Sequence, residues 1–208
     1  EQIAQVLSFK DYNAAPFLVL ATKNGLVKKT PLSEYDSPRT GGLIAISLKP
    51  GDEVVSASLV RNGDELLLVS KKAMSLRFTT DDESLRSMGR STSGVIGMKF
   101  REGDELLTMS RVDGENSFVF TATDGGYGKK TPIEEYRLQG RGGIGIKAAK
   151  IDEDSRGTLV SALVLVDTDE ILAITSAGTV MRTQASEIRQ TGRDSMGVRL
   201  VNLDEGAT

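Results

Sequence analysis

Short apolar runs separated by turn residues extend along the whole chain. Runs such as 18–21, 43–48 and 54–59 are four to six residues long and rich in Val, Ile and Leu, which is typical of β-strands. Asn24-Gly25 lies between two such runs and predicts a hairpin, because a type I′ turn needs positive φ at both central residues. No long stretch keeps a helical period, so the pattern predicts an all-β chain with short helical turns at most near 33–35 and 134–136.

The apolar pattern repeats four times. A small turn residue recurs at steps of 48, 53 and 52, and a base follows it four residues later in each copy. The turn residues are Gly25, Ala73, Gly126 and Gly178, and the bases are Lys29, Arg77, Lys130 and Arg182. A second marker, a glycine followed by an apolar residue, occurs at Gly42, Gly94, Gly143 and Gly197. Two markers with one period of about 50 predict a repeated architecture of about four strands per unit, which is a propeller or one of its relatives.

The repeats divide a single domain, 1–208, into approximate units 1–60, 61–112, 113–166 and 167–208. Residues 1–7 resemble the last strand of a preceding unit, and 203–208 match the segment 49–52 that precedes a strand in the first unit. We therefore expect both ends to fall inside the pattern and the chain to be part of a longer protein.

Composition narrows the possible functions. The 208 residues carry a formal charge of −3 and include no Cys and no His, which excludes disulfides, thiol chemistry and the usual general base. Carboxylate pairs such as Asp52-Glu53 recur in turns and are expected to be solvated, and Tyr35 and Tyr136 occupy equivalent positions and are expected to be structural. We expect no catalytic residue, no metal site, no membrane segment and a cytoplasmic location.

Charge is distributed unevenly over the repeats. The segments 28–42, 76–94, 129–143 and 181–197 hold 13 of the 26 Lys and Arg residues but only 9 of the 29 Asp and Glu residues. In a radial repeat, equivalent positions lie on the same rim, so one rim is predicted to be basic and another acidic. Regularly spaced cations suit a long polyanion, because each neutralised phosphate releases counterions.

The most distinctive motif is Gln139-Gly-Arg-Gly-Gly-Ile-Gly145, in which four glycines leave backbone amides accessible to phosphate oxygens. It also satisfies the Gly-x-Gly-x-x-Gly pattern at Gly140, Gly142 and Gly145. A dinucleotide-binding fold would need a helix next, and the apolar segment 144–149 indicates a strand instead, so that fold is rejected.

With its period of about 50 and this glycine-rich box, the chain resembles the C-terminal DNA-wrapping domain of the bacterial DNA gyrase A subunit over essentially its whole length. The family box is Gln-Arg-Arg-Gly-Gly-Lys/Arg-Gly, and the chain departs from it at Gly140 and Ile144, losing two charges. The segments 89–94 and 192–197 look like further decayed copies that each keep one Arg. The resemblance implies a six-bladed, propeller-like β-pinwheel whose neighbouring blades exchange strands. Because the family carries its box in the first blade, we expect about one and a half blades to precede this chain.

The resemblance further implies binding, bending and chiral wrapping of double-stranded DNA without sequence preference, in support of negative supercoiling. The partners would be the rest of the gyrase A subunit together with the gyrase B subunit, with ATP and Mg²⁺ belonging to other parts of that enzyme. The residues expected to contact DNA are Lys28, Lys29, Arg39, Arg77, Arg90, Lys129, Lys130, Gln139, Arg141, Gly142, Gly143, Gly145, Arg182 and Arg193. Two alternatives stay open: the corresponding domain of topoisomerase IV, and a kelch-like propeller that serves as a protein-binding scaffold.

Overall fold

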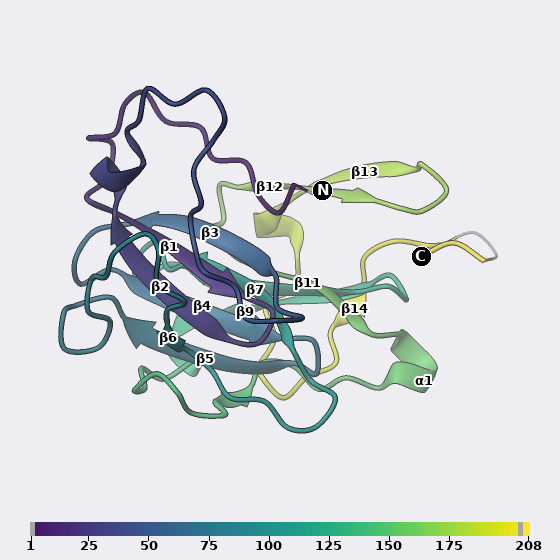
Figure 1. The fold of residues 1–208 in the computed structure, drawn as a ribbon. Helices are drawn as coiled ribbons and strands as arrows, with labels where there is room; N and C mark the ends of the chain where they lie inside the picture. Colours follow the sequence, from purple (N-terminus) through teal and green to yellow (C-terminus); the bar gives the residue numbers. More distant parts are fainter. Residues whose placement is uncertain (1–2, 204–205) are drawn as a thin grey trace.

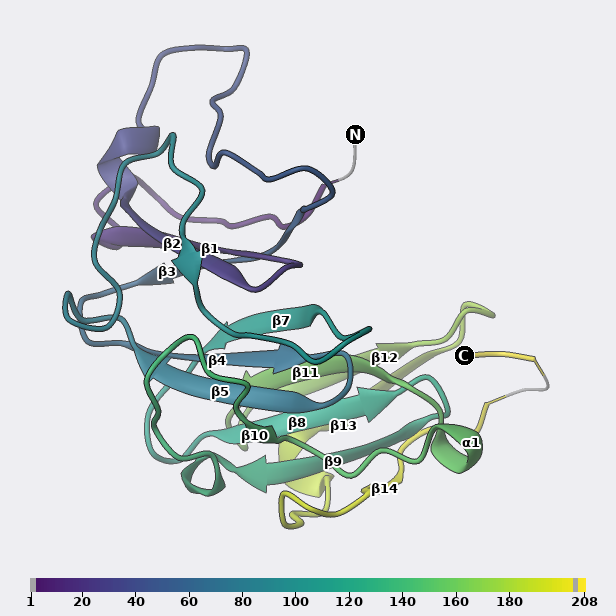
Figure 2. The same cartoon turned by 60° about the horizontal axis from the view of Figure 1, so that its bottom comes forward.

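The strands of this computed structural model form four successive antiparallel sheets, which we call blades 1 to 4 (Figures 1 and 2). The structure describes residues 3–203 and 206–208. Blade 1 has the order β3 (Val54–Val60), β1 (Phe17–Thr22), β2 (Leu26–Pro31), β6 (Val95–Ile96). Blade 2 consists of β7 (Leu106–Arg111), β4 (Glu65–Ser70), β5 (Met74–Thr79) and β10 (Ile146–Lys147). Blade 3 consists of β11 (Leu159–Leu165), β8 (Phe118–Thr123), β9 (Tyr127–Pro132) and β14 (Val198–Arg199), and blade 4 pairs β12 (Glu170–Ile174) with β13 (Val180–Gln184).

The all-β prediction with four-stranded blades is confirmed for the first three sheets. A hairpin at Asn24-Gly25 joins β1 to β2 as predicted, but Gly25 has a positive φ of +82° and Asn24 does not, so the turn is not of type I′. The helical turns expected near 33–35 and 134–136 are the 3₁₀ helices η1 (Leu32–Tyr35) and η2 (Ile133–Glu135), and η3 (Ala185–Glu187) lies at the equivalent place in the last unit. A further helical turn, α1 (Glu153–Arg156), precedes β11.

Each of the first three blades is completed by a strand from the following sequence unit. Val95 of β6 pairs with Val27 of β2, Ile146 of β10 pairs with Ser75 of β5, and β14 pairs with β9 in the same way. The exchange of strands that the resemblance implied is therefore present, and a blade does not coincide with a sequence repeat.

One edge of each blade faces its neighbours and the other faces outward. Strands β3, β7 and β11 contact one another in sequence, so these edges lie on the inside of the arc of blades. The exchanged strands β6, β10 and β14 lie at the opposite edge of each sheet, which we call the outer edge (Figure 2).

The hydrophobic core lies between successive blades. In β4, Leu66 and Leu68 pack toward blade 1 with Val19 and Phe78, while Leu67 and Val69 pack toward blade 3 with Val119. A third cluster between blades 3 and 4 contains Phe120, Leu165 and Ile188. The middle strands are thus buried on both faces, which explains why their sequences are continuous apolar runs rather than alternating ones.

Two predicted strands are absent. Residues 3–9 form no strand, although the Gln5 side chain accepts a hydrogen bond from the Ala57 amide at 2.9 Å, beside β3. Residues 43–48 also form no strand, and Ile44 and Leu48 are exposed. The equivalents of segment 43–48 are β6, β10 and β14, which each pair with the preceding blade, and residues 3–16 of the described part form no strand for segment 43–48 to pair with. The parts of the predicted terminal patterns at 1–2 and 204–205 lie outside the described residues.

Candidate nucleic-acid interface

Three equivalent loops, 86–94, 137–145 and 189–197, run along the outer edge toward the exchanged strands; we call them the outer-edge loops. Each crosses the preceding blade at the position of the repeated base. The amides of Met88, Gln139 and Thr191 donate to the carbonyl oxygens of Lys29, Arg77 and Lys130 at 2.8, 2.8 and 2.9 Å. Equivalent residues of the three loops are therefore separated by 51 and 52 positions.

The glycine that ends each loop is fixed by steric crowding. Gly94, Gly145 and Gly197 have positive φ, and a Cβ built on each would lie 2.6, 2.0 and 2.4 Å from a backbone carbonyl oxygen of the preceding blade. The prediction that Gly143 is the equivalent of Gly94 and Gly197 is therefore wrong. Gly145 is the equivalent of Gly94 and Gly197, and the corrected steps from Gly42 onward are 52, 51 and 52.

Lys28 and Lys129 lie beneath two of these loops and are buried rather than exposed to a ligand. The Lys129 ammonium donates to the carbonyl oxygens of Gly192, at 3.0 Å, and Arg193. The Lys28 ammonium binds the carbonyl oxygens of Ala45 and Arg90 in the same way. Burial lowers the pKa of each lysine to about 8. Both lysines support loop backbone, so the prediction that they contact DNA directly does not fit the structure.

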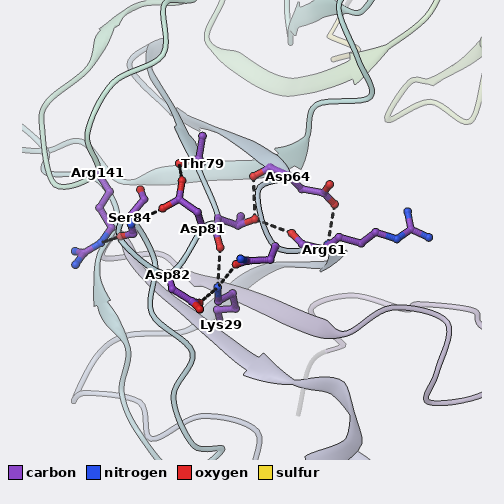
Figure 3. A network of polar contacts seen from close by, with 10 residues as sticks. Lys29, Arg61, Asp64, Thr79, Asp81, Asp82, Ser84 and Arg141 are labelled. Atoms are coloured by element: carbon purple, nitrogen blue, oxygen red, sulfur yellow. Dashed lines mark hydrogen bonds and ion pairs between the residues drawn. The ribbon is translucent and has the colours of Figure 1, made fainter.

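Lys29 and Lys130 join one blade to the next. The Lys29 ammonium is buried and donates to the carbonyl of Thr80 at 2.7 Å and to Asp82 at 2.9 Å (Figure 3). It also lies over the Phe17 ring, 4.7 Å from the ring centroid. The Lys130 ammonium donates to the carbonyl of Ala185 at 2.8 Å. Both ammonium groups are bound to acceptors in the next unit of the chain. The prediction that Lys29 and Lys130 contact DNA phosphates therefore does not fit the structure, in which they hold neighbouring blades together.

Arg77 has the same function in blade 2. Its guanidinium pairs with Glu65 and donates to the carbonyl oxygens of Ile133 and Tyr136 in the next unit at 3.0 and 3.1 Å. Arg182, the equivalent base in blade 4, is exposed and pairs with Glu170 at 2.5 Å. Arg39 is exposed in the first unit.

Arg90, Arg141 and Arg193 occupy one position in the three outer-edge loops and remain partly exposed. Each guanidinium is anchored on a carbonyl oxygen of the preceding unit: Ile44 at 2.6 Å, Ile96 at 2.9 Å and Lys147 at 2.7 Å. Arg141 also donates from Nε to the Ser84 carbonyl at 2.5 Å (Figure 3). A guanidinium has five N–H donors, so each arginine keeps donors for a phosphate in a fixed orientation.

The remaining residues of the box differ in accessibility. The Gly142 amide donates to the Gly97 carbonyl at 2.6 Å and is thus already used. Gly143 lies against the Leu76 side chain, and the buried Nε2 of Gln139 has no hydrogen-bond partner within the described residues. Only part of the bare backbone that the motif suggested is therefore available to a ligand.

A row of exposed arginines at the outer edge was missed in the sequence. Arg86, Arg137 and Arg189 follow the buried residues Leu85, Tyr136 and Ile188, and no ion pair or hydrogen bond engages their guanidinium groups within the part of the chain that the structure describes. Their spacing of 51 and 52 residues was the signal that could have identified them. Lys147 and Arg199 add exposed bases on β10 and β14.

Several bases away from these loops are paired with acids. Lys23, at the end of blade 1, contacts Glu53 at 3.2 Å and Glu105 of the next unit at 3.6 Å, and Lys71 also pairs with Glu105. These ion pairs leave less free positive charge there than in the outer-edge loops.

Comparison with known proteins gives this arrangement a family context. Residues 16–61, 64–113, 117–165 and 169–208 match the family model described as DNA gyrase C-terminal domain, beta-propeller. The chain is 62% identical to the DNA gyrase A subunit of Streptomyces coelicolor over 98% of its length, and 51% identical to that of Mycobacterium tuberculosis over 100%. It spans about a quarter of these relatives, 24% and 25% of their lengths.

Solved structures agree with the sequence comparison. A structure of a DNA gyrase A C-terminal domain superimposes with a TM-score of 0.82 at 29% identity, over 92% of this chain and 62% of the other. The C-terminal domain of a DNA topoisomerase IV gives a TM-score of 0.85 at 27% identity, over 93% and 60%. With four matched segments that together span most of its length, the chain belongs to the DNA gyrase C-terminal domain family.

Proposed function

We propose that the outer edge of the blades binds double-stranded DNA through its phosphates and bends it along the arc of blades. The observation that carries this proposal is the repetition of exposed, unpaired arginines. Within the described part of the chain, Arg86, Arg137 and Arg189 recur at one position of three consecutive units, beside the anchored and partly exposed Arg90, Arg141 and Arg193.

This arrangement favours recognition of the backbone over recognition of bases. Bending a site of about 20–30 base pairs by about 40–90° costs about 1–6 kcal/mol, which several phosphate contacts must offset. The arginines lie on loops and two-residue strands, and no helix of the described residues is of a length to enter a major groove. We therefore expect little sequence preference.

The wider role follows from the family and is part of the same proposal. The chain would wrap DNA chirally for a type II topoisomerase that introduces negative supercoils, together with the rest of the gyrase A subunit and with the B subunit. ATP and Mg²⁺ would act in those other parts, and we assign no cofactor to this chain. No helix in the described part of the chain has the length and apolar character needed to cross a bilayer. We propose a cytoplasmic, nucleoid-associated location.

Ligation of nicked circular DNA in the presence of this chain tests the proposal. At low salt we expect the closed product to show a shift in linking number toward positive writhe, and the shift should disappear steeply as salt rises. Absence of any DNA binding at low salt would overturn the proposal and would favour the protein-scaffold alternative.

The similarity to a topoisomerase IV domain supports a second candidate, a chain that binds DNA without wrapping it tightly. The same ligation assay separates the two: DNA binding without a change in linking number would favour the topoisomerase IV-like role.

A further inference from the structure

The segment that follows the β4–β5 hairpin of blade 2 is longer than the equivalent segment of blade 3. Leu85 comes eight positions after Arg77, whereas Tyr136 comes only six positions after Lys130. In blade 3 this place is taken by the 3₁₀ helix η2, and in blade 2 the residues 80–85 form a turn instead. The two additional residues give blade 2 a turn with contacts of its own.

Asp81 closes this turn. Its carboxylate accepts hydrogen bonds from the Ser84 amide, at 2.8 Å, and from the Thr79 hydroxyl, and its carbonyl accepts one from the Leu85 amide at 2.7 Å. The closed turn presents the Ser84 carbonyl oxygen to Nε of Arg141, 2.5 Å away (Figure 3). Asp81 therefore fixes the carbonyl group that holds the Arg141 side chain.

This contact distinguishes Arg141 from its sister arginines. The Arg141 guanidinium is held twice, at Nε by Ser84 and at Nη1 by the carbonyl of Ile96 in the closing strand of blade 1. Within the described residues, the guanidinium groups of Arg90 and Arg193 each donate to a single carbonyl oxygen. Two acceptors on different nitrogens fix the plane of a guanidinium as well as its position, whereas one acceptor leaves the plane free to turn.

The same turn is fastened to blade 1 by Lys29. The Lys29 ammonium donates to the Thr80 carbonyl at 2.7 Å and to the Asp82 carboxylate at 2.9 Å, on either side of Asp81. Figure 3 shows the path of contacts that leads from Lys29 through the turn to Arg141. The junction between blades 1 and 2 is thus connected to an arginine at the outer edge of blade 2.

A second path of this kind crosses the next junction. Arg77 of blade 2 donates to the carbonyl oxygens of Ile133 and Tyr136, at the two ends of η2, at 3.0 and 3.1 Å. Glu135 of η2 accepts a hydrogen bond from the Arg193 amide at 2.7 Å. At both junctions, the repeated base of one blade holds the segment after the hairpin of the next blade, and that segment holds an arginine of the outer-edge loop.

We propose that Asp81 and Glu135 are positioning residues for the outer-edge arginines, and that they couple the stacking of successive blades to DNA binding. By charge alone an acid at this edge would repel DNA, but each of these two acids favours binding because it holds an arginine in place. Coupling of two equilibria is reciprocal, so bound DNA in turn tightens the junctions between blades. This inference rests on the proposed function and adds to it residues that act without touching DNA.

Asp81→Ala, made in this chain, tests the proposal through the sign of its effect on DNA affinity at low salt. Loss of a negative charge alone would strengthen binding, whereas we expect the variant to bind about three- to tenfold more weakly because the Ser84 carbonyl is no longer fixed. Asp81→Asn keeps an oxygen for the Ser84 amide and should restore most of the affinity. Glu83→Ala is the matched control, since it removes the same charge from the same turn and breaks no hydrogen bond or ion pair of the described residues, and it should not weaken binding.

A double-mutant cycle with Arg141→Ala separates positioning from general damage to the fold. In the Arg141→Ala background, Asp81→Ala should cause no further loss of DNA affinity. An equal loss in both backgrounds, or binding by Asp81→Ala as strong as that of Glu83→Ala, would overturn the inference.

The second path is tested in the same way. Glu135→Ala should weaken DNA binding in the parent and should have no effect in the Arg193→Ala background. Glu134→Ala removes the neighbouring charge of η2 and is the control. An increase in affinity on Glu135→Ala would show that this acid only repels DNA, and the role assigned to it would be wrong.

Hydrogen exchange of the Arg141 Nε–H group, followed by NMR, gives a readout that does not depend on DNA. We expect slow exchange in the parent and in Asp81→Asn, and faster exchange in Asp81→Ala and in Lys29→Met, although Lys29 does not touch Arg141. Equal exchange rates in the parent and Asp81→Ala would overturn the positioning role. Failure of the parent to bind DNA would instead overturn the proposed function, and the exchange rates would still decide whether Asp81 holds Arg141.

Discussion

The ammonium nitrogen of Lys130, in blade 3, lies 2.8 Å from the carbonyl oxygen of Ala185, which lies in the segment that leads from blade 4. The same ammonium pairs with Asp167 and lies over the Phe118 ring, 4.6 Å from its centroid. Lys29 makes the same set of contacts between blades 1 and 2. A base at this place in the repeat therefore fastens successive blades, and its regular recurrence reflects the stacking of blades.

Lys130→Met is expected to lower the free energy of unfolding by about 2–4 kcal/mol, because it leaves the buried Ala185 carbonyl without a donor and Asp167 without its partner. Urea unfolding followed by circular dichroism measures the loss. Arg137→Met, at an exposed position nearby, is the control and should change stability by less than about 0.5 kcal/mol. If Lys130→Met instead kept full stability but reduced the salt dependence of DNA binding, the lysine would be a phosphate contact after all.

Lys28 and Lys129 predict a pH dependence of stability. Burial lowers the pKa of each from its ordinary 10.5 to about 8, so between these values the unfolded chain binds more protons than the folded one. The free energy of unfolding should therefore rise as pH increases from about 8 toward 10, by at most about 1.4 kcal/mol per pH unit for each lysine. Below pH 8 both lysines are charged in either state, and their contribution is constant.

Urea unfolding at a series of pH values measures how the free energy of unfolding changes with pH. Comparing the parent with the Lys28→Met, Lys129→Met double variant gives the part of that change that is due to the two lysines. Measurements should stop near pH 10, because the raised pKa values of Tyr35 and Tyr136 make stability fall with pH above that point. Lys72→Met, which removes an exposed lysine, should retain the parent's slope. Equal slopes in the parent and the double variant would contradict the prediction.

Arg86, Arg137 and Arg189 are expected to carry much of the affinity for DNA. Replacing all three by Ala should lower affinity at low salt and should make the dependence of log affinity on log salt shallower by about 0.9 for each lost phosphate contact. Arg61→Ala with Arg111→Ala removes bases at the ends of the inner-edge strands β3 and β7, and should leave the slope nearly unchanged. Fluorescence anisotropy with unrelated duplexes measures both, and a change in preference between duplexes would argue against backbone recognition.

Gly145 and Gly140 lie in the same loop but differ in what a methyl group would meet. At Gly145, with a φ of +80°, a Cβ would lie 2.0 Å from the Ser75 carbonyl oxygen, so Gly145→Ala must displace the exchanged strand β10 and should cost about 2–4 kcal/mol. At Gly140 a Cβ meets nothing within 4 Å, and Gly140→Ala should be within about 0.5 kcal/mol of the parent. Thermal unfolding of the two variants makes the comparison, and similar midpoints would show that β10 tolerates displacement.

The repeated strands were predictable from the sequence because apolar runs and hairpin turns are local signals, as the β1–β2 hairpin at Asn24-Gly25 illustrates. The roles of the bases were not predictable in the same way. Lys28 and Arg90 look alike as charges in a sequence, but one points into the sheet stack and the other lies on the loop above it, and only the three-dimensional path of the loop separates them.

Segment 43–48 is predicted to be a strand but forms none, and here too the three-dimensional surroundings decide the outcome. Its apolar residues predict a strand, yet a strand forms only where an edge is available to pair with, and β6, β10 and β14 find that edge on the preceding blade. The exposed arginines could have been found by aligning the loops at Gly145 rather than at Gly143, since the correct alignment brings Arg86, Arg137 and Arg189 to one position.

Because strands are exchanged, one repeat of the sequence does not correspond to one complete sheet of the structure. A duplication or deletion of one sequence repeat would move three strands of one sheet together with the closing strand of the sheet before it, as β6 closes the sheet that begins with β1. The chain therefore crosses the junction between blades 1 and 2 three times: from β3 to β4, from β5 to the borrowed strand β6, and from β6 back to β7. Loss of the last repeat would leave the sheet before it without its closing strand, whereas a row of self-contained sheets could lose its last member and leave every other sheet complete.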